Sequence, residues 1–246
     1  MRYAIITPYY RETRALLERC IFSVRNQTMG AVDHIMVADG HPQDWIDDAG
    51  VRHLRLDRAH DDYGNTPRGI GVMLAISERY DGIGLLDADN WLDPGHVALC
   101  TATFLAASKS NQIDYVIAQR RLCRPDQSVL PIVGEELGRH VDTSCFFFFP
   151  GSYHVLPHLG IMPKPLAPIG DRIIRQVLPA RGLRHAICPE VTVNYHCLWQ
   201  SIYLALGEAP PPDAKPSING GAVQAWFDAL SAEDKHLTMR RSGLVP

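Results

Sequence analysis

The stretch 82-GIGLLDADNWLDPG-95 decides how the chain is expected to fold. Its opening GIGLL is an apolar run of the kind that forms a strand buried on both faces. Asp87, Asp89 and Asp93 follow at the end of that run. Buried like charges repel one another unless a cation offsets them, so two carboxylates directly after a core strand favour a divalent metal. We therefore predict a core strand whose carboxyl end carries a functional site.

The third aspartate has a different setting from the other two. Asp93 precedes Pro94, and a helical pattern of apolar side chains follows. An aspartate at the N-cap with proline at the first helical position is a common start of a helix. We expect Asp93 to cap this helix, so that only Asp87 and Asp89 belong to the site.

Strand and helix patterns alternate on the N-terminal side of this stretch. Residues 3–10 form an apolar, β-rich run, and residues 12–27 place apolar side chains at helical spacing. A second strand pattern covers 32–40, a shorter alternating one covers 51–57, and a helix begins after Pro67. This alternation predicts an α/β fold with a Rossmann-like, mainly parallel central sheet flanked by helices. Ligands of such sheets bind at the carboxyl ends of the strands.

The C-terminal half is less regular. Strands are expected at 113–123 and 141–150, a helix at 170–182, and a last β segment at 183–197, with a short helix after it. The tail, 208–246, has the composition of a proline-rich linker followed by one peripheral amphipathic helix.

The composition excludes several classes of protein. The chain has 246 residues, 46% of them hydrophobic, which is enough for a globular core. The net charge of -3 provides no basic field, so we expect no nucleic-acid partner. No run approaches the ~18 apolar residues of a membrane span, and the N-terminus lacks the pattern of a signal peptide. Six scattered cysteines without paired spacing indicate a reducing, cytoplasmic setting.

Four stretches, taken in order, carry a resemblance to a known family. "YAIITPYYRETRALLERCIFSVRNQT", "DHIMVADG", "GNTPRGIGVMLAI" and "GLLDADNWLDPGHV" resemble the nucleotide-sugar-binding half of a family 2 glycosyltransferase with the GT-A fold. The resemblance returns in "GDRIIRQVLPARGLRHAICPEVTVNYH". It implies one GT-A domain over 1–207, with a nucleotide-sugar-binding half over 1–97 and an acceptor-binding half over 98–207. The tail 208–246 lies outside it.

The first-strand loop is expected, by this resemblance, to lie beside the nucleobase. Thr7, Pro8 and Tyr9 would form that loop, with the ring of Tyr9 offering a stacking face and Glu12 reaching the ribose or the base edge. The alternative for Tyr9 and its neighbour Tyr10 is packing in the core.

Two further residues are expected to contact the nucleotide. Asp39 matches the family's aspartate that accepts a hydrogen bond from the base, and Arg68 matches the arginine that approaches the nucleotide. A structural turn before Gly40 and a surface arginine are the corresponding alternatives. Asp39 favours uracil, with guanine and thymine nucleotides as alternatives.

The triplet 87-DAD-89 matches the family's DxD motif. Asp87 would hold the ribose or a metal-bound water, and Asp89 would ligate the metal directly. Hard oxygen ligands select Mg²⁺ or Mn²⁺, and the position of His196, which matches a later metal-binding histidine, favours Mn²⁺. The alternative for His196 is a structural residue at a strand end.

An inverting transfer needs a base that takes the proton of the acceptor hydroxyl. In the family this base is an aspartate at the start of a helix, usually in a Glu-Asp pair; here the pair is Gly170-Asp171. Asp171 is therefore the expected base, although a helix N-cap is an equal alternative. Asp142 is the fallback base.

The resemblance implies a hexosyltransferase-type enzyme that is metal-dependent and inverting. It would move one sugar from a nucleotide sugar, by preference a UDP-sugar, to a hydroxyl of a glycan, a lipid-linked acceptor or a small molecule. Synthesis of cell-surface, capsular or lipopolysaccharide glycans is the expected setting. The QxxRW motif of processive polysaccharide synthases is absent, which favours a single addition. Association into a homo-oligomer is left open.

Three other functions compete with this one. A retaining GT-A transferase would share the donor site, and a sugar nucleotidyltransferase would ordinarily carry a glycine-rich basic loop where "TPYYRE" stands. A catalytically idle nucleotide-sugar-binding module that docks a partner through its C-terminal helix is the third, and the missing glutamate before Asp171 favours it.

Overall fold

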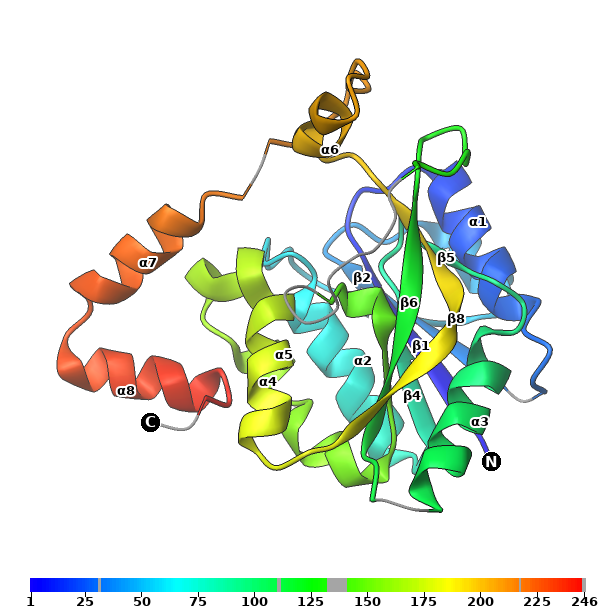
Figure 1. The fold of residues 1–246 in the computed structure, drawn as a ribbon, viewed down its shortest axis with the longest axis horizontal. Helices are drawn as coiled ribbons and strands as arrows, with labels where there is room; N and C mark the ends of the chain where they lie inside the picture. The colour runs from blue at the N-terminus through cyan, green and yellow to red at the C-terminus, as the bar shows by residue number, and fades with distance from the viewer. Residues whose placement is uncertain (31, 110–111, 132–140, 217, 245–246) are drawn as a thin grey trace.

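The computed structural model describes residues 1–30, 32–109, 112–131, 141–216 and 218–244. Within them the strands form one eight-stranded sheet in the order β3-β2-β1-β4-β7-β6-β8-β5, with helices packed around it (Figure 1). The strands are β1 (Tyr3–Tyr9), β2 (Val32–Asp39), β3 (Arg52–Leu56), β4 (Gly82–Leu85), β5 (Trp91–Leu92), β6 (Tyr115–Cys123), β7 (Phe146–Phe148) and β8 (His185–His196).

The first half of the sheet is parallel. β1 pairs with β2 and β4, and β2 pairs with β3, all in parallel. Ile6 of β1 is opposite Ile35 on one side and Leu85 on the other, and all three side chains are buried. Because these strands run in one direction, their carboxyl ends meet at one edge, as the alternating sequence pattern predicts.

The second half of the sheet is mixed. β7 lies antiparallel between β4 and β6, β8 runs parallel to β6, and β5 closes the edge antiparallel to β8. Among the described residues four of the seven strand pairings are parallel. The run Phe146, Phe147, Phe148 and Phe149 is fully buried between the two halves, which explains why so apolar a strand occurs here.

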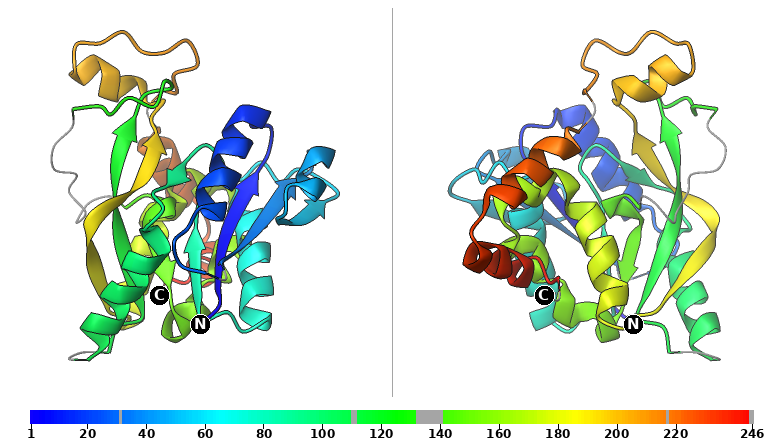
Figure 2. Two further views of the ribbon diagram at one scale, coloured as in Figure 1. Left: turned by 90° about the vertical axis from the view of Figure 1, so that its right-hand side faces the viewer. Right: turned by 60° about the vertical axis from the view of Figure 1, so that its left-hand side comes forward.

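The helices follow the predicted order. They are α1 (Arg14–Arg25), α2 (Asn65–Ser77), α3 (His96–Ser108), α4 (His158–Ile161), α5 (Gly170–Ala180), α6 (Gln200–Ala205), α7 (Gly220–Ala229) and α8 (Ala232–Arg241), with short 3-10 helices η1 (Asp44–Asp48), η2 (Thr143–Cys145), η3 (Pro150–Val155) and η4 (Lys164–Ile169). α2 packs on β1, β2 and β4 and contacts α4, whereas α3 packs on β6 and β8. Figure 2 shows α6 beyond the carboxyl ends of β6 and β8.

The helix cap expected at Asp93 is wrong. α3 begins at His96 with Gly95 at the N-cap position. The carboxylate of Asp93 instead forms an ion pair with Arg121 of β6 and accepts a hydrogen bond of 2.8 Å from Asn194 of β8. Asp93 therefore ties the end of β5 to the neighbouring strands.

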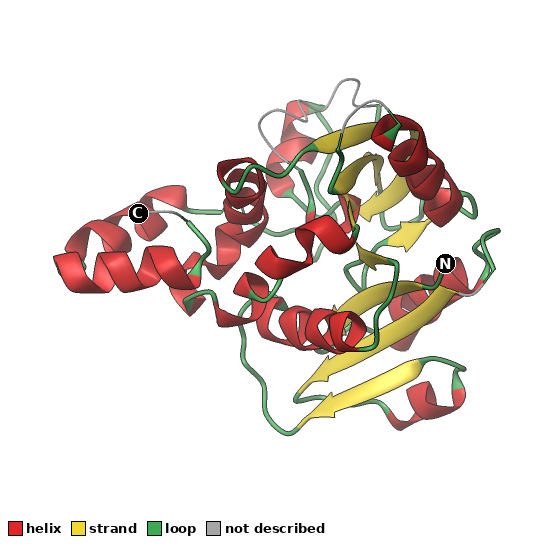
Figure 3. Ribbon diagram, turned by 90° about the horizontal axis from the view of Figure 1, so that it is seen from below, coloured by secondary structure: helices red, strands yellow, loops and turns green. Residues whose placement is uncertain are grey.

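The single C-terminal helix expected after residue 219 is also wrong, because the chain forms two helices there. Leu230 is extended, and Ser231 caps α8 by accepting a hydrogen bond of 3.1 Å from the backbone N–H of Asp234. A serine followed by acidic residues is a typical helix start that periodicity alone misses. Figures 1 and 3 show α7 and α8 at the side of the molecule.

The structure also bears on the state of the cysteines and on membrane-crossing helices. In the described ranges all six cysteines are buried free thiols. No helix in that part of the chain is long and apolar enough to cross a bilayer.

Candidate active site

Two adjoining cavities lie at the carboxyl edge of the sheet. The larger has a volume of ≈ 450 Å³ and the smaller of ≈ 290 Å³. Five residues line both of them: Tyr63, Arg68, Asp87, Asp89 and Lys215. The convergence of strand exits expected from the sequence therefore occurs, with the acids of the DAD triplet at the junction.

The smaller cavity contains most of the residues expected to bind the nucleotide. Six of those seven residues line it: Pro8, Tyr9, Glu12, Asp39, Arg68 and Asp87. The loop conformation is set in part by Glu12, which accepts a hydrogen bond of 2.7 Å from the backbone N–H of Tyr10.

Thr7 is the exception, since it lines neither cavity. It lies inside β1 with its side chain fully buried, and its hydroxyl is 2.8 Å from Nε2 of His34 on β2. Both faces of β1 are buried, and Thr7 lies two residues before the end of the strand.

The ring of Tyr9 is also committed to the interior. Its hydroxyl lies 2.7 Å from Nε2 of His53 and accepts a hydrogen bond of 3.0 Å from the backbone N–H of Gln43, and the rings of Tyr9 and His53 stack. Burial raises the pKa of Tyr9. Tyr10 lines the cavity half-buried, with its ring edge against His41. Tyr10 is thus the more exposed of the two rings, and the guanidinium of Arg11 lies over it at 4.9 Å from the ring centre.

Asp39 holds the loop that follows β3. Its buried carboxylate accepts hydrogen bonds from the backbone N–H of His60, at 3.1 Å to each oxygen, and lies 2.6 Å from Nδ1 of the same histidine. The loop continues to Tyr63, which has a φ of 57° and is 69% exposed where it lines both cavities. Tyr63 was not predicted as a site residue. The one feature of the sequence that could have indicated it is its position directly before Gly64.

A chain of polar contacts joins the two cavities. Arg68 on α2, with 4% of its side chain exposed, donates to Asp87 at 2.7 Å and to Asn65 at 2.9 Å. Asn65 in turn contacts the start of α5: a Cβ added at Gly170 would lie 2.9 Å from its Nδ2. This close approach explains why the residue before Asp171 is glycine rather than the expected acid.

Two cationic side chains, those of Lys215 and Arg19, lie near Asp89. Nζ of Lys215 lies 4.0 Å from its carboxylate, and the guanidinium of Arg19 donates to its backbone oxygen at 2.6 Å. Burial, with a smaller effect from Asp87, raises the pKa of Asp89 to about 7.

His196 lies at the end of β8 and lines neither cavity. It is 7% exposed, and neither ring nitrogen has a hydrogen-bond partner among the described residues. Its backbone N–H donates to Asn90 at 2.8 Å. Burial lowers the pKa of His196, and the charges of Arg19 and Lys215 add to this effect.

The donor atoms suit a hard divalent ion. Asp87 and Asp89 offer carboxylate oxygens, and His196 offers an imidazole nitrogen that no described residue occupies. In the described part of the chain, however, no three His, Cys, Asp or Glu side chains are grouped closely enough to hold an ion by themselves. A metal at this junction would need phosphate oxygens of a ligand to complete its coordination.

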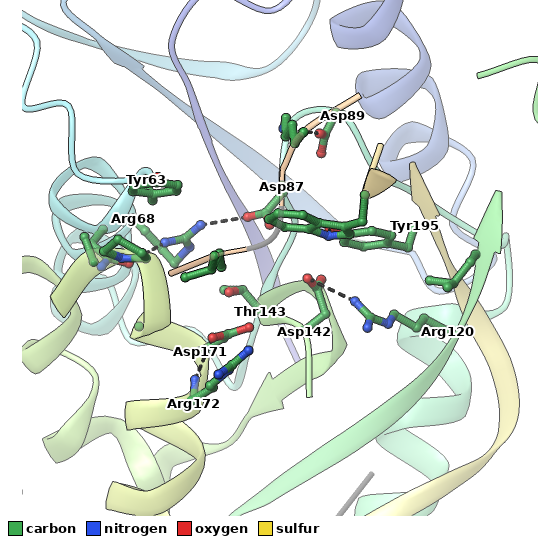
Figure 4. Close-up of a pocket in the computed structure, with 18 of the residues that line it drawn as sticks. Tyr63, Arg68, Asp87, Asp89, Arg120, Asp142, Thr143, Asp171, Arg172 and Tyr195 are labelled. Atoms are coloured by element: carbon green, nitrogen blue, oxygen red, sulfur yellow. Dashed lines mark hydrogen bonds and ion pairs between the residues drawn. The ribbon is translucent and has the colours of Figure 1, made fainter. Parts of the chain in front are cut away.

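The larger cavity holds the two candidate bases. Asp171 lies in the first turn of α5 and lines the cavity, as Figure 4 shows together with Asp87 and Asp142. Asp142 accepts a hydrogen bond of 2.9 Å from the backbone N–H of Ser144 and lies 3.3 Å from Arg120. Burial raises the pKa of Asp142 to about 6, against the opposing effect of Arg120.

Aromatic side chains that sequence reasoning missed line the same cavity. Tyr195 lies under the guanidinium of Arg120, whose carbon is 4.4 Å from the ring centre, and accepts a hydrogen bond of 2.7 Å from the indole of Trp199. Lys215 and Ile218 complete the wall, so the tail expected to be peripheral contributes to the site. The contacts of this tail arise between segments far apart in sequence.

Comparison with solved structures supports the fold. This chain is similar to S. aureus TarS 1–349, with a TM-score of 0.60 and 10% identity, over 98% of this chain and 70% of that one. The same protein in complex with UDP matches with a TM-score of 0.58 and 11% identity, over 97% and 70% of the two chains. Its complex with UDP-GlcNAc matches with a TM-score of 0.55 and 11% identity, over 98% and 65%. No family model and no curated protein matches the sequence. With the sheet order, the likeness confirms the GT-A fold that the sequence predicts.

Proposed function

We propose that this chain is a metal-dependent, inverting glycosyltransferase that moves one sugar from a nucleotide sugar to a hydroxyl acceptor. The observation that carries the proposal is the pair of cavities that meet at Asp87 and Asp89, one lined by the expected nucleotide residues and the other by Asp171. The fold is similar to that of TarS, which has been solved with UDP and UDP-GlcNAc, and UDP-GlcNAc is therefore the first donor to test. A hexosyl group and a cell-surface glycan pathway are part of the proposal.

The two cavities suggest where each substrate binds. The nucleoside occupies the smaller cavity beside Tyr10 and Asp39, and the acceptor occupies the larger one beside Asp171. The diphosphate and the anomeric carbon then lie at the junction. The larger cavity combines three aromatic side chains, Tyr63, Tyr195 and Trp199, with many polar and charged groups. This combination suits a sugar ring, which presents an apolar face and several hydroxyls.

The reaction follows from this placement. The acceptor oxygen attacks the anomeric carbon from the side opposite the diphosphate, and its proton passes to the carboxylate of Asp171. The bond from the anomeric carbon to the phosphate oxygen breaks, and its electron pair leaves with the nucleoside diphosphate. Attack from the opposite side inverts the anomeric configuration.

Asp89 would hold Mn²⁺ or Mg²⁺, with Asp87 and His196 beside it. A cation bound there would neutralise charge on the departing diphosphate. Arg68 keeps Asp87 in place through its 2.7 Å hydrogen bond, so that the first acid of the triplet stays directed at the junction.

The test is turnover of UDP-GlcNAc with Mn²⁺, measured as release of UDP. We expect Asp89→Asn to lower turnover by about 100-fold, because the charge that binds the ion is lost. Asp93→Asn is the matched control from the same stretch, since Asp93 lines neither cavity and contacts Arg121 and Asn194. Equal turnover in Asp89→Asn and the wild type would show that the metal role is wrong.

A further inference from the structure

One residue of the C-terminal tail, Lys215, lies where the two cavities meet. Lys215 lines both cavities, and its ammonium lies 4.0 Å from the carboxylate of Asp89. That separation exceeds a hydrogen bond, and the ammonium donates to no described residue. With 56% of its side chain exposed, the group is directed along open space rather than into the core.

The backbone of Lys215 is held firmly while its side chain is not. Its N–H donates to the carbonyl of Leu198 at 2.6 Å, and its carbonyl accepts from Gln200 at 3.0 Å. Upstream, Glu208 forms an ion pair of 2.6 Å with Arg124 of the loop after β6. These contacts fix the tail beside the end of β8, and the flexible four-carbon stem lets the charge adjust to a ligand.

The other cation at the junction is already engaged. Arg68 donates to Asp87 and Asn65 and is nearly fully buried, so its charge is balanced within the protein. The charged residues that line both cavities are therefore two carboxylates, one paired arginine and one lysine that makes no hydrogen bond to the described residues. A ligand that brings additional negative charge to this point would find Lys215 as its partner.

We propose that Lys215 binds the diphosphate of the nucleotide donor and neutralises the charge that this group gains when the bond to the sugar breaks. This inference rests on the proposed function. A nucleoside in the smaller cavity and an acceptor in the larger one place the diphosphate at the junction that Lys215 lines. The electron pair of the breaking bond goes to a phosphate oxygen, and the ammonium keeps its protons throughout. A compact ammonium is well suited to a group whose charge changes during the reaction.

Calorimetry with uridine and UDP, each with and without Mn²⁺, tests the inference. We expect Lys215→Met to weaken UDP binding by about 10- to 100-fold under both conditions, because a charge-assisted contact is lost. Uridine, which has no phosphate, should bind both proteins equally. Lys215→Arg should stay close to the wild type. Lys109→Met is the matched control, since Lys109 is exposed at the end of α3 and lines neither cavity.

Two outcomes would overturn the inference. One is unchanged UDP affinity in Lys215→Met, and the other is an equal loss for uridine and UDP. If the wild type binds UDP but transfers no sugar, the proposed function is wrong. The UDP and uridine affinities of the wild type and Lys215→Met still decide whether Lys215 binds the diphosphate. A wild type that binds no nucleoside diphosphate contradicts both.

Discussion

The guanidinium of Arg68 donates a hydrogen bond of 2.7 Å to the carboxylate of Asp87 at the point where the two cavities meet. The arginine comes from α2 and the aspartate from the end of β4, so the pair joins the helix to the strand exit. Asn65 accepts a second hydrogen bond from the same guanidinium at 2.9 Å. The first acid of the DAD triplet is therefore fixed by the protein, whereas the described residues give the carboxylate of Asp89 one ion pair, with Lys215 at 4.0 Å.

Removal of this arginine should weaken both the fold and the donor site. In Arg68→Met the carboxylate of Asp87 and the amide of Asn65 lose their partner, and we expect a loss of roughly 1–3 kcal/mol in the free energy of unfolding. UDP affinity should fall at least tenfold. Arg68→Lys keeps the positive charge but loses the guanidinium that donates to both Asp87 and Asn65. Its stability and its UDP affinity should lie between those of the wild type and of Arg68→Met. Urea unfolding and calorimetry measure the two effects, and wild-type UDP affinity in Arg68→Met would exclude a role in donor binding.

The two candidate bases lie on different elements of the larger cavity, and the proposed function assigns them different effects on turnover. Asp142 is engaged by Ser144 and Arg120, and Asp171 accepts a hydrogen bond of 2.7 Å from the backbone N–H of Arg172. We expect Asp171→Asn to lower kcat by about 10²- to 10⁴-fold, as loss of a general base does, with UDP affinity unchanged. Asp142→Asn is the matched comparison and should have a smaller effect. If steady-state kinetics show the reverse order, Asp142 is the base.

The glycine before Asp171 is expected to be required by packing. A Cβ at position 170 would lie 2.9 Å from Nδ2 of Asn65, which holds Arg68. Gly170→Ala should lower the free energy of unfolding by about 1–3 kcal/mol, since a buried neighbour must move, and should lower turnover as well. Gly220→Ala, where nothing lies within 4 Å, is the control. Equal stability of the two variants by chemical denaturation would contradict the close approach.

Asp142 should give the protein a characteristic dependence of stability on pH. Burial raises the pKa of this carboxyl to about 6, above its value in the unfolded chain. The folded state then binds the proton more tightly, so the contribution of Asp142 to stability is fully present below about pH 4 and is lost as the pH rises through 6. We expect Asp142→Asn to remove roughly 1–3 kcal/mol of this decline. Melting temperatures from pH 4 to 8 measure the slope, and equal slopes in both proteins would show that Asp142 does not titrate in this way.

The strand–helix order of the N-terminal half was predictable from local patterns. Continuous apolar runs gave β1, β2 and β4, and helical spacing gave α1. Six of the seven residues expected to bind the nucleotide line one cavity at these strand ends. The face on which each side chain lies was not predictable in the same way. Thr7 lies inside β1 on the same face of the strand as Tyr9, and its side chain is fully buried and lines neither cavity.

Contacts between distant segments account for the rest of what sequence reasoning missed. Asp93 resembles a helix cap locally, but Arg121 and Asn194 compete for its carboxylate. Lys215 lies near Asp89 because the tail forms backbone hydrogen bonds with Leu198 and Gln200, which follow β8. No local pattern reports such pairings, because they depend on the completed fold.

The most direct test of the central claim is a proton NMR time course of UDP-GlcNAc with Mn²⁺, in which water serves as the acceptor when no other is supplied. The account predicts that the wild type releases GlcNAc whose first-formed anomer is β, the inverse of the α-linked donor, and that Asp171→Asn releases it at least 100-fold more slowly. Release of the α anomer first, or equal rates for the two proteins, would contradict an inverting transfer with Asp171 as its base.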